Sequence, residues 1–494
     1  MFLRTSPKGK KLATLCSGLS LAVILLFSMP SPAGSMAQAP AEPLCRFGVN
    51  HHGEVSLTSI QVESLNAGYF IDYRANTAEK PASMQQLRMV RLRQPDKSRT
   101  DYIVSPDPST IVTLAQSNPG SFWLIGNEPD RQIYQDDLTP AAYARAYHEL
   151  RQIIKTADPT AILVAGNIVQ ASPIRLKYLD LVLAAYRDAY GTKMEVDAWG
   201  IHTFILNEQP GQWGADIPRG VSPEGGWVLG THQNADFTLF QQQVLAFRNW
   251  MYYNGYRNKP LYITEYGVLM PDAPGYGSFS PEDVSNYMVR TFDYLLNTRD
   301  LKLGYPADDY RLVQHFSWYS INHKAKLVNG QWEGFNGYLF DPDTGNSRTP
   351  MGDTYADYTT QLNSEIDFLI SDLRISPAAP LANNGPVTAT IQIHIGNAGN
   401  TVSAKNFTLR LYLGDPGQGG TLLSGGEFSG TLKGCGDKQV IEYVWPNVNP
   451  AKYEIFAIID PAPGASDVKP SNNQLKRTFF FATDQLYLPL VQQD

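Results

Sequence analysis

Residues 123–130 read WLIGNEPD, an apolar run that passes without a turn into Asn127 and Glu128. The run has the length and the residue types of a buried strand. An ionisable side chain at the tip of such a strand is costly unless it has a partner or a task. Pro129 ends the strand because it lacks the N–H that a sheet requires. The stretch therefore predicts a buried strand whose end presents a carboxylate.

Eight such strands are predicted along the first two thirds of the chain. They lie at 46–50, 67–74, 87–94, 122–127, 161–167, 196–205, 261–268 and 312–320, and helical patterns lie at 140–157, 174–190, 236–254, 281–298 and 349–363. The strands lack simple polar alternation, as expected when both faces of a parallel sheet are covered. This order predicts an α/β fold, a (β/α)8 TIM barrel over residues 45–363, with an open doubly wound sheet as the alternative. Thr349 and Pro350 are expected to open the last helix as N-cap and first residue.

The composition changes after residue 363. Residues 366–482 consist of short alternating strands separated by Gly, Asn and Pro turns, without a helical pattern. Roughly seven strands in this length predict an all-β immunoglobulin-like sandwich. Residues 483–494 are predicted to form a short tail.

The N-terminus has the order of a secretory signal. Basic residues precede an uncharged apolar stretch at 12–29, and small residues follow at Ser35 and Ala37. We expect a signal peptide at 1–37 and a secreted protein; a retained membrane anchor is the alternative. Removal of this segment changes the formal net charge from −7 to −11. Such an acidic chain without basic clusters disfavours nucleic acid and anionic membranes as partners, and favours a neutral substrate.

Only two cysteines, Cys45 and Cys435, follow the predicted signal peptide. They lie far apart in the sequence and in different predicted domains. We therefore expect two free or buried thiols, although an oxidising compartment would allow a bridge.

Polar side chains stand at several predicted strand ends. They are Asn127 and Glu128 on the fourth strand, His202 on the sixth, Glu265 on the seventh and Trp318 on the eighth. The chemistry of such barrels occurs at these ends. Hydrolysis of a glycosidic bond requires two carboxyl groups, one that donates a proton and one that attacks or activates water. We predict that Glu128 and Glu265 are this pair; the alternative is that each forms a structural ion pair with Arg91 or Arg93.

Two motifs, GNEPD at the fourth strand and ITEYGV at the seventh, resemble clan A glycoside hydrolases, which are retaining barrel enzymes. The resemblance covers about 45–363. It implies that Glu128 is the general acid/base and Glu265 the nucleophile. It also implies that Asn127 binds the sugar 2-hydroxyl and that Trp318 forms an apolar floor under the sugar.

One motif departs from that family. The sixth strand ends in HTF, so that Phe204 stands where the family often has a tyrosine whose hydroxyl holds the nucleophile. Tyr266 or Tyr319 is expected to substitute, and Arg74 is a candidate for orienting Glu265. His202 is predicted to line the site, with a structural core histidine as the alternative.

The C-terminal segment resembles the CARDB family of bacterial adhesion-type modules. The match runs from ISDLRI through IQIHIGNAGNT to AIIDPAPGASDVKPSNNQ at 457–474. It implies a spacer, or a module that contacts a cell surface or a glycan.

Together these patterns predict a secreted, retaining glycoside hydrolase with a polysaccharide or oligosaccharide substrate and no cofactor or metal. Adjacent His51 and His52 favour no metal site, because neighbouring strand residues point to opposite faces. The long loop at 207–236, with Trp213 and Trp227, is expected to flank a groove or to form its own small core. The alternative function is a non-catalytic carbohydrate-binding protein on the same barrel, and a transglycosylase would use the same residues.

Overall fold

The computed structural model describes residues 42–52, 55–77, 79–377 and 386–481. The predicted signal peptide and the predicted C-terminal tail lie outside these residues. Among the described helices, none has both the length and the apolar character needed to cross a bilayer.

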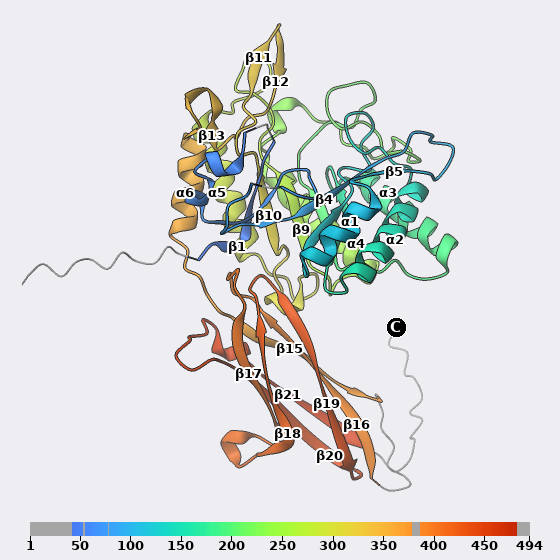
Figure 1. Ribbon diagram of the computed structural model, residues 1–494, viewed down its shortest axis with the longest axis vertical. Coiled ribbons are helices and arrows are strands. Elements are labelled where there is room, and N and C mark those ends of the chain that lie inside the picture. The colour runs from blue at the N-terminus through green and yellow to red at the C-terminus, as the bar shows by residue number, and fades with distance from the viewer. Residues whose placement is uncertain (1–41, 53–54, 78, 378–385, 482–494) are drawn as a thin grey trace, which may run out of the picture. The chain divides into compact units, whose positions relative to one another are not determined.

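The N-terminal part is built on one curled, mainly parallel sheet (Figure 1). Its strands are β1 (Leu44–Asn50), β2 (Ala67–Ile71), β3 (Gln85–Gln86), β4 (Arg88–Arg93), β5 (Ile103–Ser105), β6 (Phe122–Ile125), β7 (Ile162–Ile168), β8 (Ala198–His202), β9 (Leu261–Tyr266) and β10 (His315–Tyr319). Their order is β3-β2-β1-β10-β9-β8-β7-β6-β4-β5, and only the β4–β5 pair is antiparallel. Each of the eight predicted strands has a counterpart here.

The first strand of this order, β3, is followed directly in the chain by β4, the last of the parallel strands. Only Leu87 separates β3 from β4, and its N–H donates to the Phe70 carbonyl of β2 at 3.0 Å. The Met89 N–H of β4 donates to the Arg74 carbonyl, also at 3.0 Å. These bonds bring the start of β4 next to β2, so that the sheet curls back toward itself.

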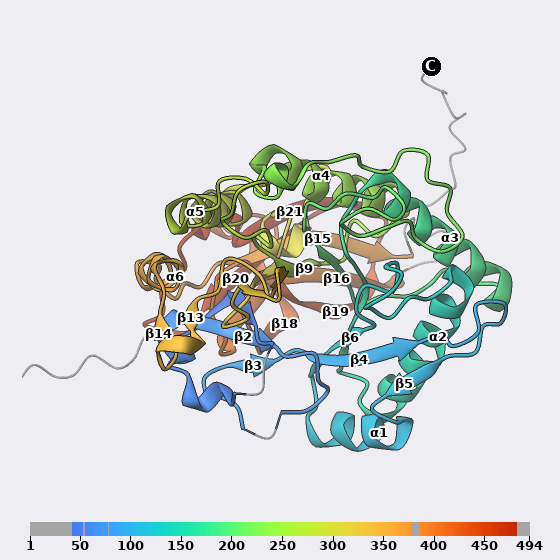
Figure 2. The same cartoon turned by 90° about the horizontal axis from the view of Figure 1, so that it is seen from above.

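Six helices lie around the outside of the curled sheet (Figure 2). They are α1 (Pro108–Ser117), α2 (Pro140–Ala157), α3 (Pro173–Tyr190), α4 (Phe237–Tyr253), α5 (Pro281–Asn297) and α6 (Pro350–Thr360). The predicted start of α6 is confirmed, because the Thr349 hydroxyl accepts the Gly352 N–H and Pro350 follows the cap. Helix α1 was not predicted; it is the shortest of the six, with ten residues, and it buries only Ile111 and Ala115.

Side chains on the two faces of the sheet enter two different apolar layers. On β6, Trp123 packs into the layer between sheet and helices, whereas Leu124 packs inside the curl with Tyr69 and Tyr262. Both layers are buried, which explains why the strands read as continuous apolar runs. The carboxyl ends of the parallel strands meet at one edge of this double core.

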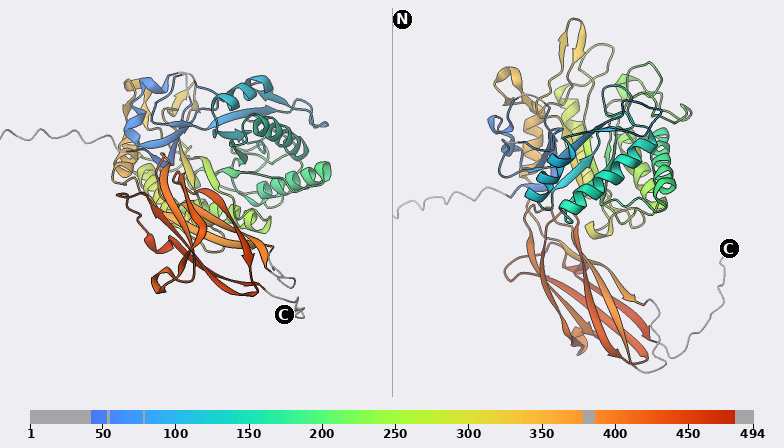
Figure 3. Two further views of the ribbon diagram at one scale, coloured as in Figure 1. Left: turned by 60° about the horizontal axis from the view of Figure 1, so that its bottom comes forward. Right: turned by 45° about the vertical axis from the view of Figure 1, so that its right-hand side comes forward.

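The C-terminal part contains only strands and short 3-10 turns among its described residues (Figure 3). They are β15 (Phe368–Ser376), β16 (Val387–Asn397), β17 (Lys405–Leu413), β18 (Thr421–Leu432), β19 (Asp437–Val448), β20 (Ala451–Pro461) and β21 (Gln474–Phe481). Two antiparallel sheets, β15-β16-β19 and β18-β17-β20-β21, contribute to one apolar core. The strand pattern is therefore as predicted, and the immunoglobulin-like topology stays a prediction.

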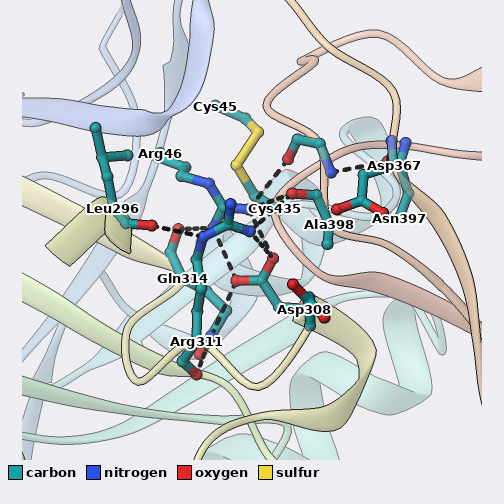
Figure 4. A network of polar contacts seen from close by, with 12 residues as sticks. Cys45, Arg46, Leu296, Asp308, Arg311, Gln314, Asp367, Asn397, Ala398 and Cys435 are labelled. Carbon is teal, nitrogen blue, oxygen red and sulfur yellow. Dashed lines mark hydrogen bonds and ion pairs between the residues drawn. A yellow bond between two sulfur atoms is a disulfide. The ribbon is translucent and has the colours of Figure 1, made fainter. Parts of the chain in front are cut away.

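The prediction of two separate thiols was wrong, because Cys45 and Cys435 form a disulfide (Figure 4). Their Cα atoms are 6.2 Å apart although 390 positions separate them in the chain. Cys45 lies on β1, and Cys435 lies in the turn between β18 and β19. The large sequence separation was misleading, because a disulfide requires that the two residues lie close in space with suitable geometry, whatever their distance along the chain.

Polar contacts accompany the disulfide (Figure 4). Buried Arg46 of β1 pairs with Asp308 at 2.6 Å and donates to the Ala398 carbonyl at 2.8 Å. Arg311 donates to the same carbonyl at 2.9 Å. These bonds tie β1 and the segment before β10 to the turn that follows β16.

Four further short strands follow β10. They are β11 (Lys326–Val328), β12 (Gln331–Glu333), β13 (Phe340–Asp341) and β14 (Ser347–Arg348), paired as two hairpins.

Candidate active site

Three ionisable side chains meet at the carboxyl ends of β6, β8 and β9. Glu128, His202 and Glu265 are buried, and one donor or acceptor atom from each lies within 4.8 Å of the others. In the sheet order β9-β8-β7-β6, His202 lies between the strands that carry the two glutamates. The predicted convergence of Glu128 and Glu265 is therefore present in the structure.

A β-bulge turns Glu265 toward this cluster. In β9, Tyr262 faces the inside of the curl and Ile263 faces the helices, so strict alternation would direct Glu265 to the helices as well. The register of β9 slips by one residue at Thr264 against both β8 and β10. This extra residue shifts the alternation and brings Glu265 to the inside.

His202 lies between the two carboxyl groups. Its Nδ1 is 2.9 Å from Glu128 Oε1, and its Nε2 is 3.3 Å from Glu265 Oε1. The ring of Phe204 packs edge-on against the imidazole at 5.9 Å. Only the Nδ1 contact is a hydrogen bond, whereas His202 Nε2 and Glu265 Oε1 have no hydrogen-bond partner among the described residues. The role of His202 toward a substrate stays a prediction.

Arg131, which the sequence reading did not single out, pairs with Glu128. Its Nη1 is 3.0 Å from Glu128 Oε2, and its Nη2 donates to the Gly214 carbonyl at 3.2 Å. It stands three residues after Glu128, in the turn that follows β6. Arg131 thus holds Glu128 and the long loop after β8 together.

Tyr73, just after β2, supplies a hydroxyl beside Glu265. Burial, and then the negative charge of Glu265, raise the pKa of the Tyr73 hydroxyl well above its usual value. A phenol that follows β2, rather than a side chain at position 204, therefore lies near Glu265. Arg74, the candidate named for this purpose, is exposed.

The surroundings of the two glutamates shift their pKa values in opposite directions. For Glu128, burial favours the neutral form, but Arg131 and His202 outweigh it and lower the pKa to about 2. For Glu265, burial and the charge of Glu128 raise the pKa to about 7, although His202 opposes the shift. Burial lowers the pKa of His202, but Glu265 and Glu128 reverse the effect and raise it. The lowered pKa of Glu128 favours its ionised form, whereas a general acid has to be protonated.

Asn127 is held by the turn that follows β6. Its Nδ2 donates to Gln135 Oε1 at 2.9 Å, and its N–H donates to Asp136 Oδ2 at 2.8 Å. Arg91 pairs with the same Asp136 at 2.7 Å rather than with a glutamate of the cluster. The alternative in which Arg91 neutralises Glu128 or Glu265 by direct contact is therefore wrong.

Trp318 and Tyr266 lie away from the carboxyl groups. Both are fully buried between the sheet and the helices, with ring centroids 5.3 Å apart, and the Trp318 indole donates to the Gly337 carbonyl at 2.7 Å. Alternation along β10 turns Tyr319, not Trp318, toward the cluster. Burial, and then the charges of Glu265 and Glu128, raise the pKa of the Tyr319 hydroxyl. This hydroxyl is 2.8 Å from His323 Nδ1. We assign no substrate contact to Trp318 or Tyr266.

A second buried ionic cluster supports the turn that carries Glu128. Arg175 at the start of α3 pairs with Asp130 at 2.6 Å and with Glu208 at 2.7 Å, and all three side chains are inaccessible to solvent. Arg175 also donates to the Ala215 and Asp216 carbonyls. The cluster fixes the loop at 207–236 against the residues that follow Glu128.

The trio Glu128, His202 and Glu265 is compact enough to be considered for a metal ion, because one ligand atom from each lies within 4.8 Å of the others. Nδ1 of His202 hydrogen-bonds Glu128 Oε1, and Arg131 pairs with Glu128 Oε2. Glu128 thus already has a cationic partner, and we assign no metal ion to this cluster.

No protein-family model and no curated protein matches the chain. Several solved structures are similar to it. A GH128 endo-β-1,3-glucanase from Amycolatopsis mediterranei, in complex with laminaritriose, is 15% identical over 63% of this chain and 98% of that chain, with a TM-score of 0.39. A β-xylosidase from Caulobacter crescentus is 13% identical over 82% and 94%, with a TM-score of 0.40. A CARDB domain from Pyrococcus furiosus is 18% identical over 24% and 90%, with a TM-score of 0.19.

These solved structures are glycoside hydrolases and a CARDB domain, the two groups that the sequence resembles. Because every one of these TM-scores lies below 0.5, neither fold nor activity is transferred from them to this chain.

Proposed function

We propose that this protein hydrolyses O-glycosidic bonds of a polysaccharide or oligosaccharide with retention of configuration. The observation that carries the proposal is the pair of buried carboxyl groups on β6 and β9, whose nearest oxygens lie within 4.8 Å. Retaining glycosidases hold the two groups about 5–5.5 Å apart, whereas inverting enzymes need about 6.5–9.5 Å to admit a water molecule. The short separation supports direct attack by one carboxylate.

The proposed fold behind this site is a (β/α)8 barrel over residues 45–363. The eight parallel strands of four or more residues, the outer helices and the hydrogen bonds between the β2 segment and the start of β4 support it. In such barrels the active site lies at the carboxyl ends of the strands, where the cluster is found. Residues 366–482 would form an immunoglobulin-like, CARDB-like spacer, and the protein would be secreted after loss of residues 1–37.

The proposed reaction is a double displacement. Glu265 attacks the anomeric carbon while Glu128 protonates the leaving oxygen, which gives a covalent glycosyl-enzyme. Glu128 then takes a proton from water, and the resulting hydroxide releases the sugar and frees Glu265. Tyr73 and His202 would stabilise the charge of Glu265 before attack, because both favour its ionised form.

The rim of the site offers surfaces for a carbohydrate. The loop at 207–236 carries half-buried Trp213 and Trp227, and the β11–β12 hairpin presents partly exposed Trp332 opposite Leu327. The base of the hairpin joins the site through Tyr319, whose hydroxyl contacts His323. Apolar faces of sugars stack on such aromatic rings, which supports an extended substrate.

A non-catalytic carbohydrate-binding protein is the second candidate. The specific observation in its favour is Arg131, whose ion pair keeps Glu128 charged and so opposes its action as an acid. A protein of this kind would bind a glycan at the same strand ends without turnover.

The experiment that separates the two candidates uses residues 38–494 and three variants, Glu128→Gln, Glu265→Gln and Glu195→Gln. Glu195 is 79% exposed and serves as the control. Each protein is incubated with plant, fungal and bacterial polysaccharides, and reducing ends and binding are measured. A glycosidase loses turnover in the first two variants only. Tight binding without release of reducing ends in any of the four proteins would refute hydrolysis.

A further inference from the structure

A cavity of about 420 Å³ lies at the amino ends of the strands, at the other end of the sheet from Glu128 and Glu265. Its walls come from the inside of the curled sheet and from the turn between β18 and β19. The disulfide between Cys45 and Cys435 lies in the lining and holds these walls together (Figure 4). Sites for small molecules have volumes of about 300–1,000 Å³. The cavity is therefore large enough for a small organic ligand.

Four aromatic side chains form one wall of this cavity, which we call the aromatic floor. The imidazole of His315, the first residue of β10, lies against three rings from three other strands. The distances between ring centroids are 5.5 Å to Tyr69, 5.8 Å to Phe122 and 4.5 Å to Tyr262. Rings at such distances pack edge-on or offset, and a further aromatic ring can pack against them in the same way.

His315 is neutral and presents a hydrogen-bond acceptor. Burial lowers its pKa to about 4, and its Nδ1 is 2.8 Å from the Cys45 carbonyl oxygen. Because a carbonyl oxygen can only accept, Nδ1 carries the proton and Nε2 has a free lone pair. His315 Nε2 has no hydrogen-bond partner among the described residues, and solvent reaches it. It is therefore available to a hydroxyl group of a ligand.

The charged side chains around the cavity form its rim. They are Lys155, Lys259, Lys433, Lys438, Asp197 and Asp437, so that positive charges exceed negative ones. Asp197 already pairs with Arg151 at 3.2 Å and with Lys155 at 3.1 Å. Asp437 accepts the backbone N–H groups of Lys433 and Lys438, both at 3.0 Å. The two carboxylates of the rim thus have partners of their own.

Lys259 and Lys438 pair with no carboxylate in the described part of the chain. The Lys438 ammonium donates only to the Asn258 carbonyl, at 3.2 Å. Burial and the charge of Lys259 lower the pKa of Lys438 to about 8, although Asp197 opposes the shift. Two neighbouring cations that destabilise each other favour the binding of an anion between them.

We propose that this cavity binds a hydroxylated aromatic carboxylate. The ring of the ligand packs on the aromatic floor, its carboxylate pairs with the ammonium groups of Lys259 and Lys438, and its hydroxyl donates to His315 Nε2. The inference is independent of the proposed function, because none of these residues takes part in the proposed reaction.

The test titrates 4-hydroxycinnamate into residues 38–494 at pH 7 and measures its Kd by calorimetry. The comparison compounds are cinnamate, which lacks the hydroxyl, glucuronate, which lacks the aromatic ring, and inorganic phosphate. We expect 4-hydroxycinnamate to bind at least about tenfold more tightly than each of them, since each lacks one of the proposed contacts. No binding of 4-hydroxycinnamate at millimolar concentration, or equal or tighter binding of any comparison compound, would overturn the proposal.

Variants locate the ligand. Lys259→Gln and Lys438→Gln should each raise the Kd about tenfold, because each removes a hydrogen bond from a charged donor. Lys326→Gln removes a charge from exposed β11 and should leave the Kd unchanged, as should Glu265→Gln at the opposite end of the strands. An unchanged Kd in both rim variants, or a loss of binding in Glu265→Gln, would place the ligand elsewhere and refute the site. Both outcomes are separate from the presence or absence of glycan hydrolysis.

Discussion

Arg175 is the side chain whose loss should cost the most stability near the site. It is inaccessible to solvent and donates five hydrogen bonds, two to Asp130, one to Glu208 and one each to the Ala215 and Asp216 carbonyls. Substitution by methionine keeps the length of the side chain and removes every donor. The two carboxylates would then be buried without a cation.

The expected loss follows from that arrangement. Removing one partner of a buried ion pair costs about 3–5 kcal/mol, because the remaining charge is left uncompensated in a poor solvent. Burial raises the pKa of Asp130, and Arg175 opposes that rise. Asp130 can therefore take up a proton in the variant, which places the expected cost for Arg175→Met near the lower end of this range, about 3 kcal/mol.

The assay is urea unfolding followed by tryptophan fluorescence, since Trp123 and Trp199 are buried in the α/β part. Arg145→Met is the matched control, because Arg145 forms ion pairs with Asp101 and Glu149 while about 39% exposed. Exposed pairs contribute at most about 1 kcal/mol. If Arg175→Met is destabilised no more than Arg145→Met, the view that this cluster fixes the loop at 207–236 is refuted.

Three further predictions concern other contacts. Replacing both Cys45 and Cys435 by alanine should lower the free energy of unfolding by about 2–4 kcal/mol, since the bridge restricts a very long loop in the unfolded chain; equal urea midpoints for the variant and the native protein would contradict this. Arg131→Met should raise the pKa of Glu128, so that the alkaline limb of the pH profile of kcat/KM moves to a pH higher by about one unit or more. An unchanged alkaline limb would show that the ion pair does not set the pKa of Glu128. The pKa of Glu265 is raised in the folded state, so that ionisation of Glu265 opposes folding. The unfolding free energy of the native protein, relative to that of Glu265→Gln, should therefore fall as the pH rises from about 5 to 7. A constant difference between the two unfolding free energies across this interval would exclude the shift.

Much of the fold could be predicted from the sequence because its signals are local. Eight apolar runs and five helical patterns correspond to strands and helices of the structure, and Thr349 caps α6 as expected. Helix α1 was not foreseen, since its ten residues contain the β-branched run Thr110, Ile111, Val112 and Thr113, which has a low helix propensity. The Cys45–Cys435 bridge depends on long-range proximity, which sequence separation does not reveal.

The site was predictable in part for the same reason. The motifs placed Glu128, His202 and Glu265 at strand ends, and the structure brings all three together. The motifs did not reveal which face of the sheet Trp318 occupies. Both faces are buried, so that the residues of an apolar run do not alternate in polarity and do not show which of them point to the helices and which to the inside of the curl. The bulge at Thr264 likewise leaves no local mark, although it decides where Glu265 points.

Arg131 and Tyr73 were missed because their importance comes from tertiary contacts. Arg131 stands in a turn, where a solvated arginine would read the same, and Tyr73 comes from a strand distant in sequence from Glu265. The signal that was present is the position of Arg131 three residues after Glu128, a spacing that allows a short turn to close an ion pair.

The most direct test of the central claim is the configuration of the first product. The glycan that gives turnover is incubated with the protein in an NMR tube, and the anomeric proton of the new reducing end is observed before mutarotation. The short separation between the oxygens of Glu128 and Glu265 predicts the anomer that the substrate had. The opposite anomer as the first product would show that water attacks directly, and would contradict the assignment of the two carboxyl groups as acid and nucleophile.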